Sequence, residues 1–143
     1  MNIEKYTQKM QGAILDSQSI ANSYGHQQLE IAHVHYAVIS DGDGLIPKLL
    51  EAMNVDVRSL KADLESSLEK LPKVSGGTSQ VYMSSELNNV LTKAEKIASD
   101  FKDDYVSVEH LYLAILESNN QEVNGLMSKY GINKDEFMNA LTM

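Results

Sequence analysis

Two nine-residue stretches, IAHVHYAVI at residues 31–39 and VEHLYLAIL at residues 108–116, decide the fold of this chain. They share a histidine at the third position, an alanine at the seventh and apolar side chains at most of the others. One gapless shift of 77 residues extends the match to residues 6–64 and 83–141. Helices that shared only a period would slip out of register over that distance, so a tandem repeat is the simplest explanation.

The two copies are equal in size and charge. We place repeat one at about residues 1–71, a linker at about 72–82 and repeat two at about 83–143, because Pro72 stops a helix and Gly76-Gly77 resists ordering. Each half of the chain carries ten acids and six bases, a net charge of −4. Neither copy is large enough to bury a comfortable core alone, so we expect the two to pack on each other.

Each copy is predicted to form four helices. The expected fold is therefore all-α, with eight helices in two four-helix repeats related by a pseudo-twofold axis and packed as one globular domain. The helical periods cover residues 3–24 and 87–101, 31–41 and 107–118, 45–53 and 122–130, and stretches that begin after Asp56 and Asn133. Ser107, Asp56 and Asn133 are predicted N-caps, and Asn54 and Gly131 are predicted to end the third helices in the left-handed conformation. The last helix of repeat two stops early, at Met143, so we expect a longer parent protein.

Composition excludes several classes of function. The 143 residues carry a net charge of −8 without a basic cluster, so neither nucleic acid nor an anionic membrane surface is an expected partner. There is no cysteine, which excludes disulfides and thiol catalysis and is compatible with a reducing, cytoplasmic compartment. The longest unbroken apolar run is too short to span a bilayer, and the N-terminus is a poor signal peptide.

The residues offer no recognisable catalytic, metal or cofactor motif. The four histidines lack metal-ligand spacing, and we expect His33 and His110 to be partly buried and to bond local backbone groups. No phosphate-binding loop or nucleophile elbow occurs. The run Asp41-Gly42-Asp43-Gly44 lacks the downstream glutamate of a calcium loop and is predicted to be a surface turn. We therefore predict no catalytic residue, no metal site and no cofactor.

The helix predicted over residues 87–101 carries a wide apolar stripe. It spans about 120° of the helix surface, wider than a narrow coiled-coil seam. Its members are Leu87, Val90, Leu91, Ala94, Ile97 and Ala98. The edge residues Leu91 and Ile97 either face the other repeat or line a groove, and plain burial in the core is the competing interpretation.

The combination of features resembles the Clp N-terminal domain family. The features are the two four-helix units, the His-x-x-x-Ala signature in each, the Tyr24-Gly25-His26 turn and the Leu71-Pro72-Lys73-Val74-Ser75-Gly76-Gly77 linker. Within that family the chain looks most like the ClpB type of the Hsp100 disaggregases. Relatives that dock adaptors usually carry Gly-Thr-Glu-His, where this chain has Glu30-Ile31-Ala32-His33 and Ser107-Val108-Glu109-His110.

The resemblance implies a binding domain without ATPase activity of its own. Such domains are tethered to an AAA+ hexamer, capture unfolded or aggregated polypeptide in an apolar groove with a polar rim, and help feed it to the pore. Carried over to this chain, the implied polypeptide-binding residues are Thr7, Leu91, Ala94, Ile97, Asp103, Glu109 and His110. Lys93 and His110 stand where apolar residues are common in the family, so the groove is expected to be shallower or differently selective.

Three alternatives stay open at this point. The first is an N domain of the ClpC or ClpA type, which docks a specific folded adaptor protein. The second is a small helical enzyme that uses Glu109 with His110 or His33, which requires those side chains to converge. The third is a free-standing scaffold of the same fold. The isolated domain is expected to be a monomer, because hexamer formation would belong to the ATPase.

Overall fold

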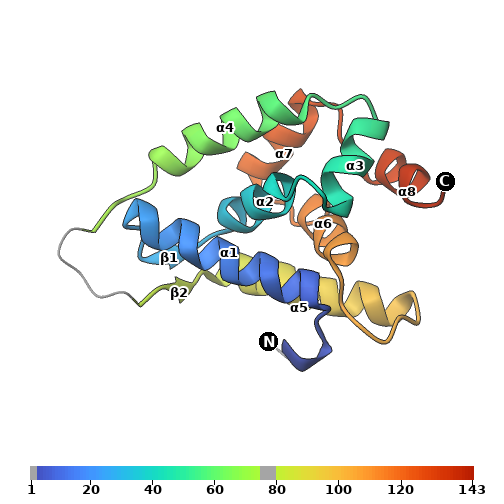
Figure 1. Cartoon of the computed structure of the whole chain (residues 1–143), viewed down its shortest axis with the longest axis horizontal. Coiled ribbons are helices and arrows are strands. Elements are labelled where there is room, and N and C mark those ends of the chain that lie inside the picture. The colour runs from blue at the N-terminus through green and yellow to red at the C-terminus, as the bar shows by residue number, and fades with distance from the viewer. Residues whose placement is uncertain (1–2, 75–79) are drawn as a thin grey trace.

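The computed structural model describes residues 3–74 and 80–143, and over these residues the fold is all-α (Figure 1). The eight helices are α1 Gln8–Tyr24, α2 Ile31–Ser40, α3 Leu45–Ala52, α4 Val57–Glu69, α5 Ser85–Asp100, α6 Val108–Leu116, α7 Gln121–Lys129 and α8 Lys134–Leu141. A 3₁₀ turn, η1, covers Ile3–Lys5, and two short strands, β1 Gln28–Leu29 and β2 Tyr82–Met83, complete the described chain. The predicted fold class of two four-helix repeats is confirmed.

The helix caps follow the 77-residue register. Thr7 and Ser84, which are equivalent in the two copies, cap α1 and α5 by accepting 3.1 Å hydrogen bonds from the backbone N–H groups of Met10 and Leu87. The predicted N-cap positions of Asp56 and Asn133 are confirmed, because each side chain accepts from the backbone N–H three residues on. The two copies therefore start their helices with the same local chemistry.

The third helices also end as predicted. Asn54 and Gly131 adopt φ angles of 62° and 67° after α3 and α7. Asparagine and glycine are the two residues that tolerate this left-handed conformation best, so both copies stop the helix at the equivalent place.

The first helix is shorter than predicted. The helical period of residues 3–24 placed Ile3 and Tyr6 on the first helix, whereas α1 begins only at Gln8. Thr7 is extended and caps α1, and Tyr6 is buried in a parallel bridge with Val106. Tyr6 is buried against the other repeat and does not extend the helix. This tertiary contact therefore outweighs the helical periodicity of the sequence.

The two repeats exchange short extended segments. β1 pairs in parallel with β2, Leu29 opposite Met83, and the Tyr6–Val106 bridge is the equivalent pair in the other copy. Ser84 N–H donates to Leu29 C=O and Thr7 N–H donates to Val106 C=O, both at 3.0 Å. Each copy thus pairs the segment before its first helix with the segment before the other copy's second helix, which ties the repeats into one unit.

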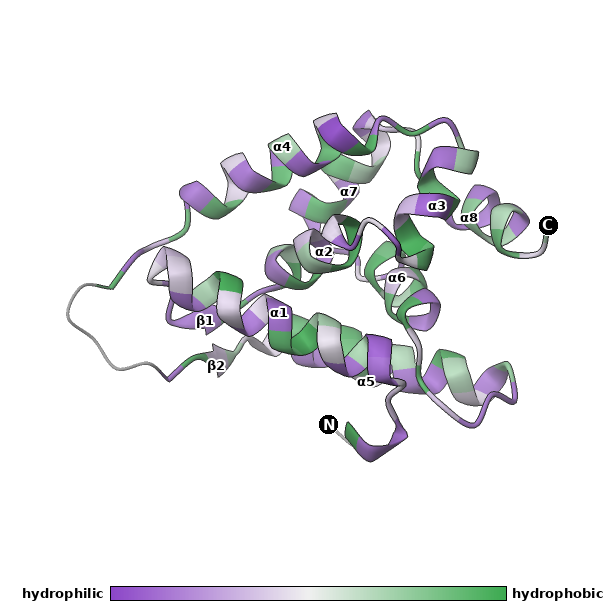
Figure 2. Cartoon of the chain, in the orientation of Figure 1, coloured by the Kyte–Doolittle hydropathy of each residue, from purple (hydrophilic) through white to green (hydrophobic). Residues whose placement is uncertain are grey.

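The core centres on α2 and α6, the two helices quoted at the outset (Figure 1). They are apolar over most of their surface, whereas the outer helices are two-faced (Figure 2). His35 and Tyr112, equivalent residues of the two copies, are both buried and share a 2.7 Å hydrogen bond between His35 Nε2 and Tyr112 Oη. This contact lies between the equivalent helices, where a pseudo-twofold relation brings a residue against its own counterpart.

The predicted linker at about 72–82 is described only in part, because residues 75–79 lie outside the described ranges. On its described flanks, Val74 N–H donates to Gly25 C=O at 2.8 Å and Tyr82 belongs to β2. Among the helices of residues 3–74 and 80–143, none combines the length and apolarity needed to cross a bilayer. The repeat boundaries stay a prediction.

Candidate functional site

A hollow of about 620 Å³ opens between the N-terminal segment, α5 and the loop that joins α5 to α6. We call it the α5–α6 hollow. Its lining residues are Glu4, Lys5, Glu95, Ala98, Ser99, Asp103, Asp104, Tyr105 and Val106. The backbone bond from Val106 N–H to Lys5 C=O, 2.8 Å long, holds its two walls together. The segment exchange between the repeats therefore creates this site, which neither copy could form alone.

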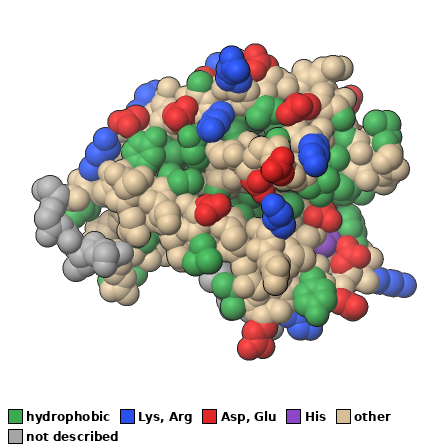
Figure 3. All heavy atoms as spheres, in the orientation of Figure 1, with side chains coloured by type: hydrophobic (Ala, Val, Ile, Leu, Met, Phe, Trp, Pro, Cys, Tyr) green, Lys and Arg blue, Asp and Glu red, His purple; other side chains and the backbone are tan. Residues whose placement is uncertain are grey.

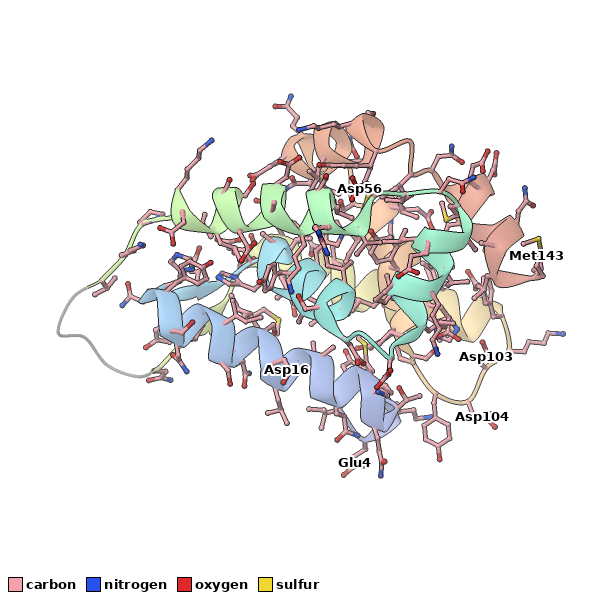
Figure 4. All side chains as sticks on the ribbon, turned by 45° about the horizontal axis from the view of Figure 1, so that its top comes forward. Glu4, Asp16, Asp56, Asp103, Asp104 and Met143 are labelled. Carbon is pink, nitrogen blue, oxygen red and sulfur yellow. The ribbon has the colours of Figure 1, made fainter. Side chains whose placement is uncertain are left out.

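The α5–α6 hollow is acidic. Glu4, Glu95, Asp103 and Asp104 line it, against the single cation of Lys5. Figure 4 shows Glu4 on the N-terminal segment and Asp103 and Asp104 on the loop after α5. The wider surface is mixed: acidic and basic side chains are interspersed with apolar patches on the face drawn in Figure 3. A cationic ligand is therefore favoured in the hollow.

One of these carboxylates, that of Glu95, also takes part in a hydrogen bond that stabilises the fold. Its Oε2 accepts a 3.0 Å hydrogen bond from the buried Tyr6 hydroxyl. Burial and the neighbouring Glu95 raise the pKa of Tyr6, so the phenol stays protonated and keeps donating. Glu95 thereby anchors α5 to the N-terminal segment at the base of the hollow.

Asp103 is engaged by His110. Ser107 N–H donates to His110 Nδ1 at 2.9 Å, so the neutral imidazole carries its proton on Nε2 and donates it to Asp103 Oδ2 at 2.8 Å. This arrangement ties the α5–α6 loop to the first turn of α6. The prediction that His110 bonds local backbone groups is confirmed.

The first repeat has the same arrangement of hydrogen bonds around its histidine, with a different residue at the far end. Glu30 N–H donates to His33 Nδ1 at 2.8 Å, and His33 Nε2 in turn lies 2.8 Å from Nδ1 of His26, the counterpart of Asp103. The equivalent prediction for His33 is also confirmed. Burial, helped by the neighbouring His26, lowers the pKa of His33 to about 4, so this pair is neutral at physiological pH.

Four of the seven predicted polypeptide-binding residues are accessible, and one of them, Asp103, lines the α5–α6 hollow. Ile97 is half-buried on α5 but does not line the hollow, because it lies about 100° or more around the helix from Glu95, Ala98 and Ser99. Thr7 and Glu109 are half-buried, Thr7 paired through its backbone with Val106 and Glu109 in the first turn of α6. The structure therefore places Thr7, Asp103 and Glu109 close to the Tyr6–Val106 bridge but not Ile97, and Thr7 also serves as the cap of α1.

The other three predicted residues lie in the interior. Leu91 is 1% exposed, Ala94 is 0% exposed and His110 is 1% exposed. The apolar stripe of α5 faces the core over these positions, so Leu91 and Ala94 support the hollow from behind. A polypeptide on the surface of this conformation can reach Ile97 at the edge of the stripe but not its centre.

Exposed aromatic side chains beside the hollow were not predicted. Tyr105 lines it and is 58% exposed, and Phe101, at the end of α5, is 42% exposed and packs edge-on to the His110 ring. Helical periodicity had placed Phe101 at the end of the helix predicted over residues 87–101 and gave no information about Tyr105. The only sequence signal was an aromatic residue on each side of Asp103-Asp104 in an otherwise polar loop.

The histidines form separate clusters in the described residues. His33 bonds His26 and the Glu30 backbone, whereas His110 bonds Asp103 and Ser107. No hydrogen bond described in residues 3–74 and 80–143 joins Glu109 to either histidine, and no three His, Asp or Glu side chains of these ranges gather as a metal site. The enzyme hypothesis requires Glu109 to converge with His110 or His33, and the hydrogen bonds of the described residues do not join them.

Comparison with known proteins places this geometry in a family. The model of the Clp repeat (R) N-terminal domain matches residues 5–130. Chaperone protein ClpB of Clostridium tetani (strain Massachusetts / E88) is 41% identical over 144 residues, which cover 99% of this chain and 17% of that protein. ClpB of Brucella suis biovar 1 (strain 1330) is 39% identical over 132 residues, covering 92% of this chain and 15% of that protein. The chain thus spans about a sixth of the length of such relatives.

Solved structures share the fold. The Hsp104 N-terminal domain from Candida albicans aligns with a TM-score of 0.83 at 24% identity, covering 95% of this chain and 88% of that one. The N-domain of ClpV, solved in complex with a VipB peptide, aligns with a TM-score of 0.78 at 16% identity, covering 99% and 87% of the two chains. At these identities the likeness concerns the fold alone.

Proposed function

The chain belongs to the family of Clp repeat N-terminal domains, and from this we propose that it is the substrate-recognition domain of a ClpB-type AAA+ protein disaggregase. In this role it binds unfolded or aggregated polypeptide weakly and passes it to the ATPase ring of the parent hexamer. The binding residues are Thr7, Asp103 and Glu109 around the α5–α6 hollow, with Tyr105 added from the structure, and Ile97 on an adjoining face of α5. Leu91, Ala94 and His110 act from behind, as the packing that shapes the hollow.

One observation carries this proposal: the hollow joins exposed apolar surface to an acidic rim. Tyr105, which is 58% exposed, offers apolar area beside the carboxylates of Asp103 and Asp104, which line the same hollow. Each Å² of apolar surface that a bound segment buries contributes about 25 cal/mol. Ordering an unfolded segment offsets much of that gain, so the expected affinity is weak and tolerant of sequence. Segments with Lys or Arg beside apolar residues should bind best.

The test is an NMR titration of the isotope-labelled domain with a permanently unfolded protein such as casein. We expect fast-exchange shifts of the Ile97, Asp103, Tyr105 and Glu109 amides, with a dissociation constant of about micromolar or weaker. Replacing Tyr105→Ser should weaken binding several-fold. Tyr82→Ser is the matched control, since Tyr82 is 53% exposed but does not line the hollow. Absence of shifts at these amides up to saturating casein contradicts the proposal.

A second candidate is docking of a defined adaptor protein. The ClpV N-domain, which shares the fold, has been solved with a VipB peptide, so this scaffold can hold a specific partner segment. A saturable one-to-one complex with a folded protein, together with no response to casein, would favour this candidate over capture of unfolded chains.

A further inference from the structure

A second groove, of about 610 Å³, runs between α1, α2 and α3. We call it the α1–α3 groove. Its floor is apolar, and its rim carries three aspartates and one lysine. The floor residues are Ala13, Ala37, Val38, Ile46 and Val108, and the rim residues include Gln8, Lys9, Gly12, Asp16, Asp41, Asp43 and Leu45. Gln8 follows Thr7 and Val108 precedes Glu109, so the groove adjoins the candidate site on the side away from the α5–α6 loop.

In the second repeat the equivalent lining is divided between two smaller hollows. One, of about 130 Å³, is lined by Asn89, Val90, Lys93, Ala114 and Ile31 among others. The other, of about 200 Å³, holds the counterparts Asn120, Glu122 and Val123. Two replacements account for part of the difference. Asn89 stands where the first copy has Gly12, and Lys93 stands where it has Asp16. The Lys93 side chain lies across its hollow and donates to the Glu117 carbonyl at 3.3 Å.

Gly12 costs stability without a steric reason. It lies inside α1, where glycine is less favourable than alanine by about 1 kcal/mol. Its φ angle is not positive, and a Cβ added there would meet no atom within 4 Å. The missing side chain therefore serves neither the backbone conformation nor close packing. Its effect in this structure is to leave the α1–α3 groove open.

Charge indicates what the groove would hold. Asp16, Asp41 and Asp43 line it, and Lys9 is the cation among its lining residues. Lys9 Nζ lies 3.1 Å from Asp41 Oδ2, while Asp16 and Asp43 enter no ion pair within residues 3–74 and 80–143. Figure 4 shows Asp16 on α1. The leftover charge is negative, and the counterpart in repeat two has the positive Lys93 at the place of Asp16.

We propose that the α1–α3 groove is a second contact site for the polypeptide that this domain captures, taking an aliphatic or aromatic side chain flanked by Lys or Arg. The apolar side chain packs on Ala13, Val38 and Ile46, and the flanking cation lies beside Asp16 and Asp43. This inference rests on the proposed function. It adds a binding position to the site around the α5–α6 hollow, and it makes repeat one an active partner in recognition.

The test uses the full domain and two short fluorescein-labelled peptides, one of alternating Leu and Lys and one of alternating Leu and Glu. Fluorescence anisotropy should show tighter binding of the Leu-Lys peptide. Gly12→Gln fills the groove with a helix-favouring side chain and should weaken that binding by at least about tenfold while the thermal midpoint stays or rises. Ser19→Gln, an exposed position of α1 outside the groove, is the matched control and should bind as the parent does.

A second variant tests the charge. Asp16→Lys introduces the residue that the other repeat carries and should reduce the preference for Leu-Lys over Leu-Glu, leaving only the part that the acidic α5–α6 hollow supplies. Unchanged Leu-Lys binding by Gly12→Gln, or an undiminished preference in Asp16→Lys, overturns the second site.

The casein titration separates the two proposals, because the Gly12, Asp16 and Asp43 amides report on the α1–α3 groove and the Asp103 and Tyr105 amides on the hollow. Shifts confined to the hollow refute the second site and leave the proposed function standing. Shifts in neither region refute both.

Discussion

This domain should lose stability on acidification at pH values well above those at which carboxylates titrate, because two of its histidines are buried. His33 and His35 are 0% and 1% exposed. Burial lowers the pKa of His33 to about 4 and that of His35 to about 3, from an ordinary value of 6.5. Between these values the unfolded chain binds protons that the folded protein does not. The free energy of unfolding therefore falls as the pH drops below about 6.5, and the loss levels off only near the folded-state pKa values.

The expected size follows from these values. A histidine that stays neutral in the folded protein becomes protonated in the unfolded chain as the pH falls. Each such histidine should lower the free energy of unfolding by about 2 kcal/mol between about pH 7 and about pH 5. His33 and His35 together should cost about 4 kcal/mol, a large part of a typical stability of about 5–15 kcal/mol. His26, whose pKa burial also lowers, acts in the same direction.

Urea unfolding followed by circular dichroism at the two pH values measures this loss. In His35→Gln the difference between the two pH values should shrink by about 2 kcal/mol, because one titrating group is gone. Tyr112→Phe is the matched control: it breaks the same His35–Tyr112 hydrogen bond but keeps the imidazole, so it should keep the full difference. If His35→Gln retains the parent's pH dependence, or Tyr112→Phe loses as much as His35→Gln does, the reasoning is refuted.

Two further predictions concern the repeat architecture. Ser84→Ala and Thr7→Ala each remove a helix N-cap, and each should lower the free energy of unfolding by about 1 kcal/mol in urea titrations; a loss in only one of them would show that the equivalent caps are not equivalent in energy. Asn54→Gly should be neutral or slightly stabilising and Asn54→Ala destabilising by about 1 kcal/mol, because residue 54 has a φ of 62°; equal thermal midpoints for the two variants would argue against a left-handed residue at this position.

Much of the local structure was readable from the chain. The sequence predicted the repeat register and several local features that depend on contacts a few residues apart. These features are the helix ends at Asn54 and Gly131, the caps at Asp56 and Asn133, and the backbone hydrogen bonds of His33 and His110. Such contacts depend on residue type and spacing alone, so a pattern that recurs at 77 residues could predict them.

The candidate site could be predicted only in part. Helical periodicity marked Leu91, Ala94 and Ile97 as one stripe but could not say which of its members would be covered. Burial of Leu91 and Ala94 depends on how α5 packs against the rest of the core, which no local pattern records. Tyr105 is exposed for the same kind of reason: its loop is held outward by the Asp103–His110 bond and the Tyr6–Val106 bridge.

The sequence by itself determined the repeat, the helices and their ends, because those depend on backbone hydrogen bonding and on side chains within one or two turns. Only the tertiary structure decided that the repeats exchange extended segments, that Tyr6 leaves the first helix to pair with Val106, and that His35 meets its own counterpart Tyr112. These features join residues of different repeats, and their free energy comes from burial that exists only once both copies have folded against each other. The α5–α6 hollow is a product of that burial, and so is the open α1–α3 groove beside it.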